Sequence, residues 1–163
     1  MSDSLFDPAA FLSAQQTEVN EKRELFPVSN PTSPDGLYIG VIGEISTASG
    51  TIGKGEKTGE PWMSIVIPIK FDVPQQLQAE KQLPATFQFT DRVFLDLMPG
   101  GRGIDNGKGK NKGQFAYREA LGMNTPGEPF SWAATQGRPI KFRLVHELYN
   151  GNIMEKIAGV FKA

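Results

Sequence analysis

The alternation of apolar and polar residues predicts five β-strands after residue 36. In the first four of these stretches apolar side chains recur at every second position over part of the length, as they do in half-buried strands. The clearest case is Met63, Ile65, Ile67 and Ile69, whose shared parity predicts that they face a core. The last stretch has Ile153, Ile157 and Val160 as its apolar residues. Asn150-Gly151 separates the last two stretches and is a strong hairpin signal. The predicted strands are 37–46, 62–71, 87–98, 138–149 and 152–162.

The segments between these strands predict how the strands connect. Residues 47–61 form a turn-rich loop, and the polar stretch 72–86 contains a short helix. A second short helix is expected over 114–122, ended by Gly122. Strand, strand, strand, helix, strand, strand is the order of an OB-type barrel. We therefore expect an all-β or β-rich fold, a five-stranded OB-like barrel with one short helix between strands 3 and 4, although five-stranded α+β folds share this order.

Residues 1–36 differ from the rest of the chain. Asp7 before Pro8 predicts a helix start, and that helix could continue into the 20s. Three prolines then occur within 27–36, which predicts an extended linker. The expected division is therefore an acidic, partly disordered segment at 1–36 and an OB-like domain at 37–163.

Composition removes several classes of protein. The 163 residues include no Cys and a single His, His146, which excludes disulfide frameworks, cysteine zinc sites and two-histidine metal sites. No apolar run is long enough for a transmembrane helix, and the first residues lack the basic and apolar regions of a secretory signal. We expect no cofactor, no metal and no membrane association.

Catalytic motifs fail at identifiable positions. His146-Glu147 begins like a zinc-protease motif, but Asn150 stands where the second His would be. Gly107-Lys108 begins like the end of a phosphate-binding loop, but Gly109 replaces the hydroxyl residue. The sequence therefore does not indicate an enzyme.

Charge is unevenly distributed along the chain. The formal net charge is -1, yet residues 1–36 carry six acids and two bases, whereas residues 101–163 carry five acids and ten bases. A basic end indicates an anionic partner, against the alternative of an ordinary solvated surface. Single-stranded nucleic acid fits this pattern, because a basic groove follows its phosphates. The candidate phosphate contacts are Lys54, Lys57, Arg102, Lys108, Lys110, Lys112, Arg118, Lys141 and Arg143.

Aromatic residues supply the second half of the pattern, since bases stack on aromatic faces. Phe89, Phe94 and Phe142 are assigned to the core. For the others, burial in the core is the competing interpretation. The stacking candidates are Trp62, Tyr117, Trp132 and Tyr149.

Three pieces of the sequence resemble small phage-encoded single-stranded DNA-binding proteins. They are Arg118-Glu-Ala-Leu-Gly122, then Gly137-Arg138-Pro-Ile-Lys with its hairpin at Tyr149-Asn-Gly151, and the closing Ile157-Ala-Gly-Val-Phe-Lys162. Gly36-x-Tyr38 and Thr58-Gly59-x-Pro61 also fit, so the resemblance spans residues 36–162.

The resemblance implies an OB-fold protein that coats exposed single-stranded DNA during phage replication or recombination in the bacterial cytoplasm, often as a homo-oligomer. Such proteins often recruit replication or recombination partners through an acidic C-terminal tail. Here the acidic segment is at the front, so residues 1–36 are the expected recruiting element, or alternatively a segment that competes in cis for the basic groove. Two alternatives remain: a module that binds a host enzyme, and a small virion assembly protein.

Overall fold

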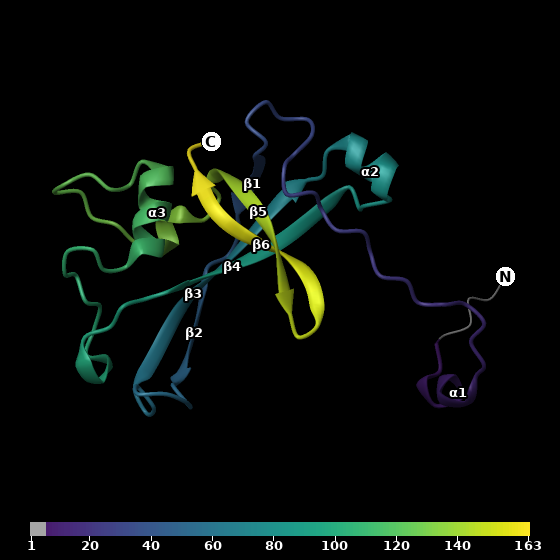
Figure 1. The fold of residues 1–163 in the computed structure, drawn as a ribbon, viewed down its shortest axis with the longest axis horizontal. Helices are drawn as coiled ribbons and strands as arrows, with labels where there is room; N and C mark the ends of the chain where they lie inside the picture. Colours follow the sequence, from purple (N-terminus) through teal and green to yellow (C-terminus); the bar gives the residue numbers. More distant parts are fainter. Residues whose placement is uncertain (1–5) are drawn as a thin grey trace.

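The computed structural model, which describes residues 6–163, is built on one antiparallel sheet of six strands (Figure 1). The β-rich class is therefore confirmed. The strands are β1 Tyr38–Ile42, β2 Ser46–Thr51, β3 Pro61–Asp72, β4 Thr86–Phe94, β5 Pro139–Tyr149 and β6 Asn152–Phe161. The helices are α1 Pro8–Ser13, α2 Gln75–Lys81 and α3 Lys112–Leu121, with short 3₁₀ turns at Pro99–Gly101 and Trp132–Thr135.

Strand β3 is the centre of the sheet. It pairs with β4 along one side and with β2 and β1 in succession along the other, and β1 continues through β5 to β6. The sequence predicted a loop where β2 lies, because Ser46–Thr51 has only small residues and no apolar alternation. Since β1 and β2 pair with consecutive parts of β3, they act as one strand interrupted at 43–45.

Helices α2 and α3 were both predicted, and α3 ends as expected. Gly122 follows its last residue with φ of 67°, and its N–H donates to the carbonyls of Arg118 and Glu119. Helix α3 contacts both β4 and β6 at the two ends of the strand order. Helix α1, in contrast, stops at Ser13 instead of continuing into the 20s, because none of its residues is buried by the rest of the protein.

The core is a cluster of aliphatic and aromatic side chains on the concave side of the sheet. Ile65, Ile67 and Ile69 face it, as their parity predicted. Phe89 and Phe142 are also buried, as predicted, whereas Phe94 is 59% exposed and the prediction that it belongs to the core is wrong. The reason is strand parity: Phe94 pairs with Ser64 on the outer face, next to the inward pair Val93 and Ile65.

The segment before β1 is part of the folded domain, which corrects the predicted division at residue 36. We call residues 22–36 the strap. Its Phe26 is completely buried and its ring lies 5.0–5.4 Å from those of Phe71, Phe87 and Phe89. One apolar residue in a polar, proline-rich stretch produced no periodic signal, so the sequence did not reveal it.

Polar contacts fix the strap against β5 and β6. The Glu155 carboxylate, 2% exposed, accepts hydrogen bonds from both terminal nitrogens of Arg23 at 2.6 and 2.8 Å and from the Phe26 N–H at 2.8 Å. His146 Nε2 lies 2.7 Å from the Phe26 carbonyl, and the Tyr38 hydroxyl donates to the Pro27 carbonyl. Burial alone would raise the pKa of Glu155, but the Arg23 and Phe26 hydrogen bonds outweigh it and lower the pKa.

Residues 6–21, which we call the arm, extend away from the sheet (Figure 1). Every arm residue is exposed. The arm leaves the domain beside the β5–β6 hairpin, where Lys22 Nζ donates to Asn152 Oδ1 at 3.0 Å.

Candidate nucleic-acid interface

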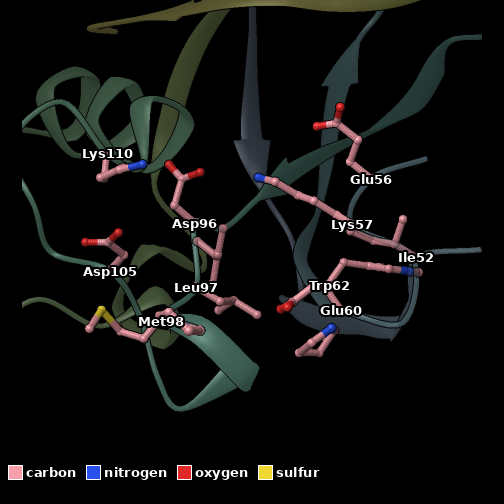
Figure 2. A pocket seen from close by; sticks show the side chains of 13 residues that line it. Ile52, Glu56, Lys57, Glu60, Trp62, Asp96, Leu97, Met98, Asp105 and Lys110 are labelled. Atoms are coloured by element: carbon pink, nitrogen blue, oxygen red, sulfur yellow. The ribbon is translucent and has the colours of Figure 1, made fainter. Parts of the chain in front are cut away.

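A surface depression lies where the β2–β3 connection meets the segment after β4. We call it the hairpin–loop pocket; its volume is about 400 Å³. Residues 52–60 supply one wall and residues 95–110 the other, and Figure 2 shows Lys57 extending from the first wall toward the second. The lining residues are Ile52, Glu56, Lys57, Glu60, Pro61, Trp62, Leu95, Asp96, Leu97, Met98, Pro99, Asp105 and Lys110.

An aromatic pair lies beside this pocket on the outer face of the sheet: Trp62, which lines the pocket and is partly buried, and Phe94, which is exposed and does not line it. The rings of Trp62 and Phe94 are 5.7 Å apart and inclined at 55°. Gly50 on β2 makes room for the indole, because a Cβ there would lie 2.9 Å from Trp62 Nε1. Ser64, which follows on the same face of β3, is fully buried, and its hydroxyl has no hydrogen-bond partner among the described residues. The pair therefore presents apolar ring surface where a sheet exterior is usually polar.

The second wall, a glycine-rich basic loop, is held in shape by Asn111. The Asn111 side chain accepts the Asp96 N–H at 2.7 Å and donates to the Asp105 carbonyl at 2.9 Å. The backbone N–H of Asn111 donates to Asp96 Oδ2 at 2.6 Å. No sequence pattern singled out this buried asparagine, which sets the position of Lys110 next to it.

The charges of the pocket are mixed. Lys57 and Lys110 face four carboxylates, of which two are engaged inside the loop: Asp96 accepts from Asn111 and Asp105 accepts from the Gly107 N–H. The other two carboxylates, on Glu56 and Glu60, lie on the hairpin side (Figure 2). The predicted bases Lys54, Arg102 and Lys108 are exposed on the same two loops.

The surface continues around Lys110 to helix α3. A smaller hollow of about 140 Å³ shares Lys110 and adds Gln114, Phe115 and Arg118. The Arg118 guanidinium stacks 4.7 Å from the centre of the Phe130 ring, and its Nε donates to the Met123 carbonyl. Lys112, also predicted, is exposed at the first residue of α3.

Two stacking candidates are occupied by contacts within the protein. Tyr117 is 2% exposed and its hydroxyl donates to Asp91 at 2.7 Å, so it offers no ring face to a base. Burial raises the pKa of Asp91, which the Tyr117 hydrogen bond only partly offsets. Trp132 is partly buried between Tyr117 and Phe130, and its Nε1 donates to Gln114. Both side chains therefore pack inside the protein, which was the alternative to base stacking in the sequence analysis.

Three predicted residues lie apart from this surface. Lys141 and Arg143 stand on the outer face of β5, where Lys141 forms an ion pair with Asp35 at 3.0 Å. Tyr149 is 64% exposed at the end of β5. None of the three lines either hollow. The structure thus brings Lys57, Trp62 and Lys110 together and adds Phe94, which sequence reasoning missed although its parity with Asp96 was a signal.

Comparison with known proteins does not identify a family or a function for this chain. No protein-family model matches the chain, and no curated protein matches it either. Within residues 6–163, no group of three or more His, Asp or Glu side chains is placed to hold a metal ion. The helices of that range are all too short or too polar to serve as membrane spans.

Proposed function

We propose that this chain binds single-stranded DNA without sequence preference, at the hairpin–loop pocket and the Trp62–Phe94 pair. The observation that carries the proposal is the contact between the exposed Phe94 and the partly exposed Trp62 on a sheet surface, beside two loops that carry lysines. Every base has a π-face, so stacking on such a pair needs no sequence code, while lysine and arginine contact the phosphates. The phosphate contacts are assigned to Lys54, Lys57, Arg102, Lys108, Lys110, Lys112 and Arg118.

The strand connectivity supports an OB-type barrel that is open on one side. If β1 and β2 count as one bent strand, five strands remain, with α3 between the third and the fourth. Strands β4 and β6 lie near each other without a ladder between them, and α3 contacts both. The aromatic pair then lies on the outer face of the second and third strands.

The biological setting rests on the sequence resemblance alone. In this proposal the protein coats exposed strands during phage replication or recombination in the host cytoplasm and performs no catalysis. Recruitment of partner enzymes, which the acidic segment predicted, is assigned to the arm at 6–21, because the strap is occupied by its own domain.

Fluorescence anisotropy with a labelled oligo-dT of about thirty nucleotides tests the proposal against a duplex of equal length. We expect tight binding to the single strand that weakens steeply as salt rises, because counterions are released on binding. Equal affinity for the duplex, or no binding at low salt, would reject the proposal. The second outcome would favour the module that binds a host protein.

A further inference from the structure

The outer face of β1, β5 and β6 carries apolar residues interleaved with bases, which we call the apolar–basic face. Val41 pairs with Lys70 of β3 and Pro139 of β5, and Ile39 pairs with Lys141, which in turn pairs with Phe161. Ile39, Val41 and Phe161 are 54%, 47% and 41% exposed. Arg143 is the next outward residue of β5.

A pocket of about 370 Å³ opens in this face between β1 and β3. It forms because only Val41 and Ile42 of β1 pair with β3, while residues 38–40 pair with β5 alone. Gly40 is required at its floor, since a Cβ there would lie 2.9 Å from the Lys70 carbonyl. Its other lining residues are Ile39, Val41, Lys70, Phe71, Asp72 and Pro139, so one base and one acid lie at the pocket.

This face is distinct from the proposed DNA surface. Lys70 lies eight residues along β3 from Trp62, roughly 26 Å of extended strand. The two surfaces share no lining residue. What the apolar–basic face binds is therefore a separate question from DNA binding.

The arm has the complementary chemistry. Between residues 6 and 21 it has three acids, Asp7, Glu18 and Glu21, and no base. Phe6 and Phe11 contact each other at 5.3 Å between ring centres, yet they remain 71% and 44% exposed. Leu12 is 87% exposed. On the face, Lys141 is paired with Asp35 and Asp72 accompanies Lys70, so Arg143 is the base with no acid beside it in these contacts. The exposed phenylalanines of the arm match the apolar pocket, and its acids match Lys70 and Arg143.

We propose that the arm of one copy of this chain docks on the apolar–basic face of a second copy, with Phe11 in the pocket between Ile39 and Val41. The acids of the arm then lie near Lys70 and Arg143. A second copy is favoured over the same copy because the arm leaves the domain beside the β5–β6 hairpin and points away from the sheet (Figure 1). Each copy offers both an arm and a face, so a two-fold dimer satisfies both reciprocally.

Sedimentation velocity of the full chain over a range of concentrations tests the assembly. We expect a monomer–dimer equilibrium that Phe11→Ala weakens by about tenfold or more, because the burial of one aromatic side chain is lost. Ile153→Ala is the matched control: Ile153 is 58% exposed on the β5–β6 hairpin, outside this face, and its loss should leave the equilibrium unchanged.

A charge exchange tests the docking partners. Lys70→Glu with Arg143→Glu should weaken the dimer, and so should Glu18→Lys with Glu21→Lys. In a mixed dimer of the two variants both arm–face contacts again join opposite charges, so the mixture should associate more strongly than either variant alone. A chain that stays monomeric at every concentration overturns the proposal, even if its arm occupies its own face. So does a mixture no stronger than its components.

Discussion

Trp62 and Phe94 show how strand parity decides the chemistry of a single residue. Both are large aromatic side chains in strands, and composition alone would bury both. Each stands on the outward parity of its strand, opposite a small residue that leaves room for the ring, Gly50 for Trp62 and Ser64 for Phe94. The exposed ring of Phe94 and the partly exposed ring of Trp62 are the strongest reason at this scale to expect a ligand.

Substitution of either aromatic residue should weaken DNA binding. For Trp62→Ala and Phe94→Ala separately, we expect a loss of about 1–3 kcal/mol in binding free energy, the usual value of one stacked base. Anisotropy with oligo-dT at a fixed salt concentration measures it. Ile153→Ala serves as the control with unchanged affinity, and unchanged affinity in both aromatic variants would contradict the assigned stacking role.

Substitution of Tyr117 should change the stability of the protein, because its hydroxyl is bonded inside the protein to Asp91. Tyr117→Phe removes the hydroxyl donor from the buried Asp91 carboxyl and should cost about 1–3 kcal/mol in unfolding free energy. The pKa of Asp91 is raised in the fold, so its contribution is present below its usual pKa and lost as pH rises. The Tyr117 hydrogen bond by itself lowers this pKa, so it stabilises the ionised carboxylate, and its loss should cost more at neutral pH than at about pH 3. Urea unfolding at both pH values checks this, with the exposed Tyr149→Phe as the control.

At the scale of elements, the glycine-rich loop combines an anchored frame with free lysines. Asn111 ties its end to Asp96 and Asp105, while Lys108 stands exposed and Lys110 lies in both hollows. Such a loop can offer charges at a defined place without a costly ordering step on binding.

Neutralising this loop should change the salt dependence of binding. For Lys108→Gln with Lys110→Gln, the slope of log K against log salt should become shallower by about 0.7 for each phosphate that the variant no longer neutralises. Titrations of oligo-dT at several salt concentrations give the slope. Lys156→Gln is the control: Lys156 lies on β6 outside both hollows, and its loss should leave the slope unchanged. If the slope changes equally in this variant, the net charge of the protein explains the effect and the loop lysines have no specific role.

The strap makes stability depend on pH through Glu155. Because the pKa of Glu155 is lowered in the fold, its contribution is present above its usual value of 4.5 and lost as pH falls through the folded value. Glu155→Gln should lower the unfolding free energy at pH 7 by about 1.5–3 kcal/mol, the range for hydrogen bonds to a charged group. The two proteins should converge in acid. Denaturant unfolding across this pH range measures the difference, and a constant difference would contradict the assignment.

At the scale of the molecule, the sequence predicted most of the helices and strands but not the packing of the strap against β5 and β6. Alternation located β1, β3, β4 and β5, the Asn150-Gly151 hairpin signal located β6, and Gly122 located the end of α3. Strand β2 was missed because its small side chains are placed by pairing with β3, which is a tertiary effect. Phe26 was missed because burial of one residue depends on distant partners. The candidate site was predicted in its lysines and Trp62, and its remaining aromatic, Phe94, needed the register of β3 and β4.

Truncations should separate the arm from the strap. Removal of residues 1–20 should leave the thermal midpoint unchanged, because the arm buries nothing in its own domain. Removal of residues 1–36 should lower it strongly, because the loss of Phe26 alone leaves a cavity worth about 3–5 kcal/mol. Circular dichroism melting compares the two. Equal midpoints would show that the strap is dispensable.

The contact between Phe26 and Glu155 also has a consequence for how the protein is made. The two residues are 129 positions apart, so the carboxylate that holds the strap is synthesised long after the strap itself. Until β6 has left the ribosome, the Phe26 N–H lacks the Glu155 carboxylate that holds it, and Phe26 is not fixed over the aromatic cluster. Such a distant contact slows folding. A chain that ends before residue 155 would therefore expose an aggregation-prone aromatic surface. Chaperones and proteases can recognise such a surface and so distinguish the truncated chain from the complete protein.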